Sequence, residues 1–167
     1  MKILNTERAI LTLLKKNDFG DILKMFSEQN AFKYVKPFQN KDENFFIEFL
    51  NKKLAQNKSL NGIGVWVAKN IETDEFIGLV NLNPFANTEM IQLGCHLKQD
   101  FRKQGFATEL TNRVLKYGID EIGLKCIYGI IENENFASKR LMEKLDFVFE
   151  KSEIIFETKI EIYKCTV

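Results

Sequence analysis

Apolar positions in the first half of the chain follow two different periods. The apolar run over residues 9–14 predicts a strand. Helical spacing follows, first from Asp18 to Phe26 and again from Asp42 to Leu54, so each stretch predicts an amphipathic helix. Two such helices need a sheet to cover their apolar faces.

The middle of the chain contains the next strands of that sheet. Residues 63–67 and 76–82 alternate apolar with small or polar side chains, and a turn-like segment at 72–74 separates them. This pattern predicts an antiparallel hairpin. Residues 90–97 predict a further strand, which leads into a polar loop that ends at Gly105.

The second half of the chain alternates helices with strands. In order, it predicts a helix over 106–121 closed by Gly123, a strand over 126–131, a helix over 135–145, and strands over 147–156 and 160–167. The complete order indicates a mixed α/β sheet with helices on its faces. With 167 residues the chain has the length of one domain, so residues 1–167 are expected to fold as a single unit.

Composition narrows the classes of function. The net charge is only +1, which argues against a broad electrostatic field for nucleic acid or an anionic membrane. Three widely spaced cysteines favour a reducing compartment, and no apolar run suits an export signal or a membrane span, so we expect a cytoplasmic protein. His96 is the single histidine and no Cys-x-x-Cys pair exists, so no metal site is expected.

The polar loop at residues 102–108, Arg-Lys-Gln-Gly-Phe-Ala-Thr, is the best candidate for binding an anion. It stands before a predicted helix, where unpaired backbone N–H groups and the positive end of the helix dipole converge. Gly105 permits close approach of a ligand, and Arg102 and Lys103 add positive charge. The alternative interpretation is an ordinary, solvated strand-to-helix turn. P-loop and dinucleotide-binding motifs are absent from the sequence.

The pattern Arg102-x-x-Gly105-x-Ala107 after a strand resembles the acetyl-CoA signature of GNAT acetyltransferases. Further segments resemble the branch that contains ribosomal-protein N-terminal acetyltransferases of the RimJ/RimL type: Thr6-Glu7-Arg8, Leu93-Gly94, Asn135-x-x-Ser138, Glu143-Lys144-Leu145 and Phe147. Two positions depart from the family pattern, namely Asp146, where glycine is usual at the helix end, and Gln92, where relatives often carry glutamate.

The resemblance implies a fold and a binding mode for acetyl-CoA. The fold would be a mostly antiparallel sheet of about seven strands flanked by about four helices. Its two central parallel strands, ending at Leu97 and spanning 126–132, would splay apart and hold the pantetheine arm through the backbone near Cys95 and Leu97. The pyrophosphate would bind the backbone amides of six residues: Lys103, Gln104, Gly105, Phe106, Ala107 and Thr108. The Asn135 side chain would bind the arm, or cap its helix, or do both.

The resemblance also implies direct attack of a neutral amine on the thioester, and the residues limit which groups assist. The tyrosine that many relatives use is replaced by Met142. The resemblance to the ribosomal-protein branch implies that Ser138 assists the departing thiolate, with a plain helix-surface serine as the alternative. Glu132 is a candidate base, with an inert strand-end acid or a water chain as alternatives. Strand alternation places His96 on the face opposite Cys95, so His96 is expected to be structural.

Three hypotheses about the acceptor remain open at this level. The acceptor is a protein N-terminal amine, or it is a small amine such as a polyamine, amino acid or antibiotic, or the chain is a non-catalytic CoA-binding module. A cationic small amine would favour an acidic pocket, for which Asp42, Glu43 and Glu48 are candidates. A group of aromatic residues either lines the acceptor cleft or belongs to the core: Phe32, Tyr34, Phe38, Phe45 and Phe46. A monomer and a homodimer are both compatible with the sequence.

Overall fold

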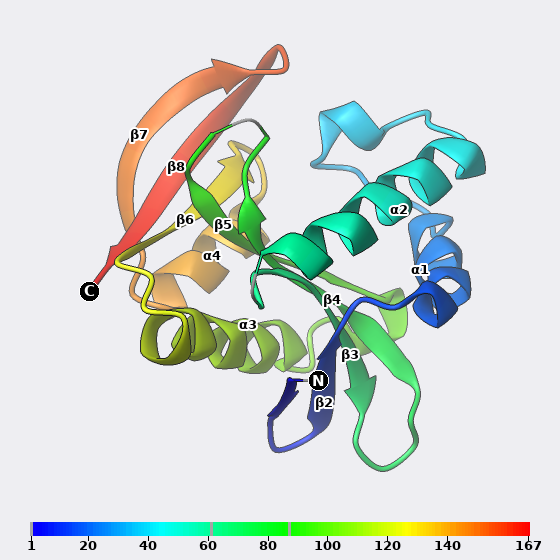
Figure 1. The fold of residues 1–167 in the computed structure, drawn as a ribbon. Coiled ribbons are helices and arrows are strands. Elements are labelled where there is room, and N and C mark those ends of the chain that lie inside the picture. Colours follow the sequence, from blue (N-terminus) through cyan, green and yellow to red (C-terminus); the bar gives the residue numbers. More distant parts are fainter. Residues whose placement is uncertain (1, 61, 87) are drawn as a thin grey trace.

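The computed structural model describes residues 2–60, 62–86 and 88–167. Within these residues, eight strands form one sheet in the order β1-β2-β3-β4-β5-β6-β8-β7 (Figure 1). The strands are β1 (Ile3–Asn5), β2 (Ala9–Leu13), β3 (Gly64–Asn70), β4 (Phe76–Pro84), β5 (Ile91–Leu97), β6 (Cys126–Glu132), β7 (Val148–Ile155) and β8 (Thr158–Thr166). The α-helices are α1 (Phe19–Phe26), α2 (Glu43–Ser59), α3 (Phe106–Lys116) and α4 (Phe136–Lys144).

The sheet is antiparallel except at its centre, where β5 and β6 run parallel. These two strands share one register pair, Gln92 with Tyr128, whereas β4 and β5 share seven. The sheet is therefore split between β5 and β6, as the resemblance implied. We call the gap between these two strands the split.

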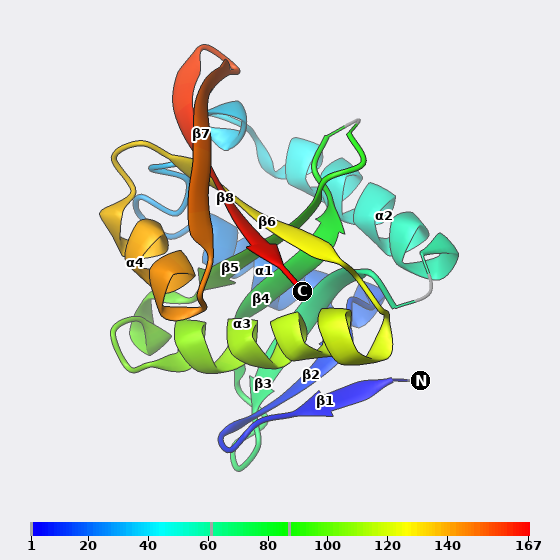
Figure 2. The ribbon, with the colours of Figure 1, turned by 90° about the vertical axis from the view of Figure 1, so that its left-hand side faces the viewer.

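Two apolar clusters lie on opposite faces of the sheet. On one face α1 and α2 pack against Val65 and Val67 of β3. On the other face α3 and α4 pack over Trp66, whose side chain is fully buried, and over the neighbouring strands. Figure 2 shows α3 on the face of the sheet away from α2. The alternation of side chains along β3 produces this three-layer arrangement.

The predicted mixed α/β fold is confirmed, with two differences of detail. An eighth strand, β1, escaped prediction because three residues are too few for a period to show. The helix predicted over 106–121 is α-helical to Lys116 and continues as a π-helical turn, Tyr117–Glu121. Gly123 follows with a φ of 80°, the left-handed conformation expected at the end of a helix.

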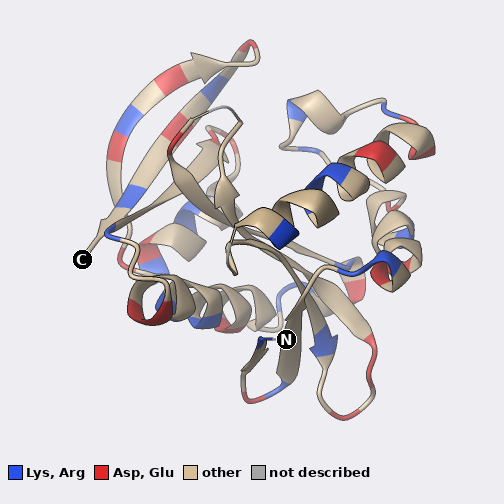
Figure 3. Ribbon diagram, in the orientation of Figure 1, with Lys and Arg blue, Asp and Glu red and all other residues tan. Residues whose placement is uncertain are grey.

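Charge is dispersed over the structure. Residues of both signs lie on the four α-helices and on β7 and β8, whereas β1, β2, β4 and β5 carry no charged residue (Figure 3). Among the described residues, no helix combines the length and the apolar character that crossing a membrane requires.

Candidate active site

The loop before α3 has the local geometry of an anion-binding site. Gly105 is the N-cap of α3 with a φ of 85°, and Lys103 has a φ of 60°. Within the described chain, the backbone N–H groups from residue 103 to residue 108 have no hydrogen-bond acceptor. Six unpaired amides at a helix N-terminus suit a pyrophosphate.

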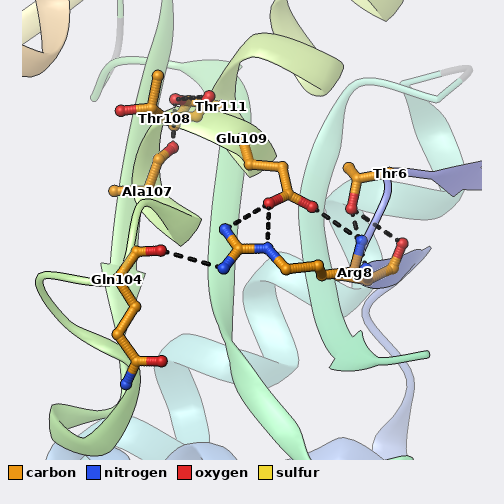
Figure 4. Close-up of polar contacts among 8 residues, drawn as sticks. Thr6, Arg8, Gln104, Ala107, Thr108, Glu109 and Thr111 are labelled. Carbon is orange, nitrogen blue, oxygen red and sulfur yellow. Dashed lines mark hydrogen bonds and ion pairs between the residues drawn. The ribbon is translucent and has the colours of Figure 1, made fainter. Parts of the chain in front are cut away.

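Arg8, at the start of β2, fixes this loop from the side (Figure 4). Its Nε donates to Glu109 of α3 at 2.7 Å and its Nη1 donates to the Gln104 carbonyl at 3.1 Å. The guanidinium also lies 4.0 Å from the centre of the Phe106 ring. From the sequence, Arg8 was identified only as part of the family pattern. Its contact with the loop could not be predicted, because about a hundred residues separate the two in the chain.

The Arg8 contact controls the ionisation of Glu109. Burial tends to raise the pKa of the Glu109 carboxyl, but hydrogen bonds from Thr6 and Arg8 outweigh it and lower the pKa below its usual value. The carboxylate is therefore ionised at neutral pH, and the ion pair of Arg8 Nη2 with Glu109, at 2.6 Å, is maintained there.

Arg102 performs a different task from the one its sequence position indicates. Its Nε donates to the Leu97 carbonyl at 3.0 Å, and its Nη2 lies 3.6 Å from the Glu28 carboxylate. The side chain therefore ties the loop to the end of β5, with its charge partly compensated by Glu28. Arg102 was expected to add positive charge to the loop, and Glu28 offsets part of that charge.

Cys95 and His96 point to opposite faces of β5, as strand alternation predicted. Cys95 packs with the α3 and α4 cluster, and burial raises the pKa of its thiol to about 12, so the thiol stays protonated. His96 lies on the α1 side, with ring centres 5.6 Å from Phe26 and 5.4 Å from Phe32. Burial, followed by the positive charge of Arg102, lowers the pKa of His96 to about 4. His96 is therefore uncharged at neutral pH, and its Nε2 has no partner in the described chain.

One cavity of about 490 Å³ passes through the split, and we call it the central cavity. Its lining includes both Cys95 and His96, so it opens toward both faces of the sheet. On the α4 side it is lined by Asn135 and Ser138, and at the end of β6 by Glu132. Four predicted site residues, Cys95, Glu132, Asn135 and Ser138, thus meet in one cavity.

The remaining predicted residues lie outside the central cavity. Leu97 belongs to the buried cluster at the end of β5, and residues 102–108 form the adjoining loop. The two groups are linked in sequence and space, since β5 runs from the cavity to the loop. A long ligand with a phosphate end and an apolar arm matches this layout.

Helix α4 carries Asn135 at its N-cap and the buried Met142 near its C-terminal end. The Asn135 Oδ1 accepts a hydrogen bond from the Ser138 N–H at 3.2 Å, which confirms the predicted N-cap. Met142 is buried, and a Cβ at position 129 would lie only 2.6 Å from its sulfur. Gly129 therefore allows α4 to approach β6 closely, and no hydroxyl is present at position 142.

The expected aromatic residues divide between the central cavity and the core. Phe32, Tyr34 and Phe38 line the central cavity, whereas Phe46 is buried in the core and Phe45 packs beside Phe38.

The acidic pocket proposed for a cationic acceptor is wrong. Asp42, Glu43 and Glu48 are exposed and do not line the cavity, although Phe49 and Lys53 of α2 do. The charged residues in the lining are Lys36, Lys53 and Glu132.

A second hollow, of about 550 Å³, lies beside β7. It is bordered by Glu143, Asp146, Phe147, Val148, Phe149 and Tyr163. None of these lining residues belongs to the predicted site. The central cavity is therefore the candidate site.

Comparisons with known proteins agree with this geometry. The family model described as an acetyltransferase (GNAT) domain matches residues 8–148. An uncharacterized N-acetyltransferase, YoaA of Bacillus subtilis (strain 168), is 27% identical over 146 residues, which cover 87% of this chain and 82% of that protein. An acetyltransferase structure from Agrobacterium tumefaciens str. C58 has a TM-score of 0.87 at 18% identity, covering 100% of this chain and 95% of its own.

A further similar structure contains coenzyme A. RimL, described as a ribosomal L7/L12 alpha-N-protein acetyltransferase in complex with CoA, has a TM-score of 0.81 at 11% identity, covering 99% of this chain and 98% of its own. At that identity the likeness shows the fold. Because the family model matches most of the chain, the protein belongs to the GNAT acetyltransferase domain family.

Proposed function

We propose that this protein transfers the acetyl group of acetyl-CoA to a primary amine by direct attack of the amine on the thioester. The observation that carries the proposal is the central cavity, which brings Ser138, Asn135 and Glu132 together in the split. The loop at 103–108 supplies unpaired amides for the pyrophosphate at the end of β5. The two features together fit the length and chemistry of acetyl-CoA.

The proposed reaction balances without a covalent enzyme intermediate. The amine nitrogen forms a bond to the acetyl carbon, the carbon–sulfur bond breaks, and the ammonium that results loses a proton. Glu132 accepts a proton from the amine, directly or through water, and the Ser138 hydroxyl hydrogen-bonds the departing thiolate. Cys95 takes no part as a nucleophile, because its buried thiol stays protonated at neutral pH.

The acceptor that we propose is an α-amine, with a protein N-terminus as one form of it. An α-amine with a pKa near 8 is partly neutral at pH 7, whereas a lysine amine near 10.4 is almost fully protonated. The neutral fraction of the amine matters here because Glu132 is the only carboxylate among the described residues that line the cavity, so few groups can deprotonate the amine. The similarity to the ribosomal-protein acetyltransferase RimL supports the N-terminal form, and a small α-amine is the alternative.

The proposal extends to the setting of the reaction. Cys95, Cys126 and Cys165 are free thiols, which suits the cytoplasm. We propose that the chain acts there as a monomer or homodimer, without a metal ion.

The test is thiol release from acetyl-CoA, followed with a thiol reagent in the presence of peptides, amino acids, polyamines and aminoglycosides. Turnover with any amine class supports the proposal, and Ser138→Ala should then lower kcat by about tenfold or more. Ser152→Ala, on the exposed strand β7, is the matched control and should leave kcat unchanged. Tight binding of acetyl-CoA without thiol release for any amine would favour the non-catalytic alternative and contradict the proposal.

A further inference from the structure

The central cavity reaches the α1 and α2 face of the sheet, where its lining includes Phe26 and Phe49. The loop that fits the pyrophosphate precedes α3, and α3 packs on the opposite face. The cavity passes through the split, because its lining includes Ser138 of α4 and Phe49 of α2. The acetyl group would therefore meet the acceptor within the split, with the acceptor's body on the α2 side.

The α2 side of the cavity is lined mainly by aromatic rings. Five of them, which we call the aromatic wall, are Phe26, Phe32, Tyr34, Phe38 and Phe49. The rings pack against one another. The ring centre of Phe38 lies 5.2 Å from that of Phe32 and 4.8 Å from that of Phe49, and both pairs are in edge-to-face contact. Phe32 in turn stacks on the buried Phe46 at 5.0 Å. A rigid wall of ring faces and edges suits a planar apolar group.

The wall is uncharged except for a lysine. His96 lies beside Phe26 and Phe32, with its ring in contact with both, and is neutral at pH 7. Lys53, one turn beyond Phe49, lines the cavity and has no carboxylate within ion-pair distance in the described chain. Its Nζ donates to Gln56 at 3.2 Å.

A second lysine that lines the cavity, Lys36, has its charge paired with a glutamate. Lys36 lines the cavity and pairs with Glu157 of the β7–β8 turn at 3.5 Å. The positive charge that remains uncompensated on the acceptor side is therefore that of Lys53. It repels a polycation and attracts a carboxylate.

We propose that the acceptor is an α-amine attached to an aromatic side chain, whose ring packs on the aromatic wall and whose carboxylate faces Lys53. This inference rests on the proposed acetyltransferase function and specifies its substrate class. A free aromatic amino acid carries the α-amine, the ring and the carboxylate on one residue. A dipeptide with an aromatic N-terminal residue, such as Phe-Ala, carries the amine and the ring there and its carboxylate on the next residue. Polyamines and aminoglycosides lack both the ring and the carboxylate.

The experiment compares kcat/KM for phenylalanine, phenylalaninamide, alanine, the dipeptide Phe-Ala and spermidine in the thiol-release assay. Phenylalanine or Phe-Ala should exceed alanine by about tenfold or more, because burying a ring contributes about 1.5–3 kcal/mol. Whichever of the two is faster identifies the source as a free amino acid or a peptide. Alanine or spermidine turning over as fast as both would overturn the inference and leave the proposed function intact.

Lys53→Met tests the carboxylate contact with a side chain of similar length. It should lower kcat/KM for phenylalanine by about tenfold and change that for phenylalaninamide by less than about twofold. Lys58→Met, exposed near the end of the same helix, is the matched control and should change neither. Equal losses for the acid and the amide would contradict the role of Lys53. If no amine releases thiol, the proposed function itself fails, and this inference fails with it.

Discussion

At the residue scale, the central cavity contains few groups that can move a proton. Cys95 is a protonated thiol and His96 a weakly basic imidazole, since burial moves their pKa values to about 12 and about 4. Met142 has no hydroxyl and is buried against Gly129. Glu132 is the carboxylate in the lining that can accept a proton, and Ser138 on α4 offers a hydroxyl to a thiolate. Tyr34 and Thr158 are the other hydroxyl-bearing residues of the lining.

Replacing Glu132 with glutamine tests its role through pH. If Glu132 is the base, E132Q should lower kcat/KM by about tenfold to a hundredfold at pH 7. The loss should shrink as the pH rises above about 8, where an α-amine is already neutral and needs no base. Glu134→Gln, two residues away and exposed, is the control. A loss that stays constant with pH would indicate a binding role for Glu132 instead.

Some of these residue-level features could be predicted and others could not. Alternation along one strand suffices to separate Cys95 from His96, and the departure at Asp146 correctly marked a helix end, where φ is 61°. The contacts of Arg102 with Glu28 and the Leu97 carbonyl could not be predicted, because Glu28 is far away in sequence. Long-range pairing of charges leaves no local pattern.

At the element scale, the Arg8 contact joins the start of β2 to the start of α3. Arg8 binds Glu109 and the Gln104 carbonyl, so it fixes the loop in the conformation that presents its amides. It also covers Gly105, since a Cβ there would lie 3.4 Å from the Arg8 Nη2. The loop is held by side chains from outside it, and its own residues supply the backbone donors.

Arg8→Gln should weaken acetyl-CoA binding by about tenfold without removing a predicted ligand contact, because the loop loses its support. The free energy of unfolding should fall by about 1 kcal/mol at pH 7, a modest value because Arg8 is partly exposed. Calorimetry and urea denaturation measure the two effects. Unchanged affinity would show that the loop holds its conformation without Arg8.

The stability effect of Arg8→Gln should depend on pH with a definite sign. The folded-state pKa of Glu109 is lowered, so its ion pair stabilises the protein above the unfolded pKa, near 4.3, and this contribution is lost as the pH falls through the folded pKa. The difference in unfolding free energy between wild type and R8Q should therefore diminish below about pH 4. A difference that is constant with pH would assign the effect to lost packing on Phe106.

Element types were largely predictable because their apolar periods are clear. The hairpin of β3 and β4 and helices α1 to α4 were found close to their observed bounds. The short strand β1 and the π-helical end of α3 were not, since three residues carry no period and both helix types share similar spacing. The parallel pair of β5 and β6 at the centre of the sheet was expected from the family resemblance and could not be derived from periodicity.

At the scale of the whole molecule, function depends on a cavity that crosses the sheet. A single register pair between β5 and β6 opens the split, and helices on opposite faces line its two ends. The sequence indicated the α4 end through Asn135 and Ser138. The acidic pocket predicted at the acceptor end was wrong, because the sequence does not show which side of α2 faces the cavity. Lysine, and not glutamate, faces it.

Hydrogen–deuterium exchange with and without acetyl-CoA would test most directly where the protein holds its substrate. We expect slower exchange at residues 103–108, whose free amides would gain an acceptor, and at the start of α4 around Ser138. The hollow beside β7 should be unaffected and serves as the internal control. Protection confined to that hollow, or saturating binding without protection at 103–108, would contradict the assignment of acetyl-CoA to the loop and the split.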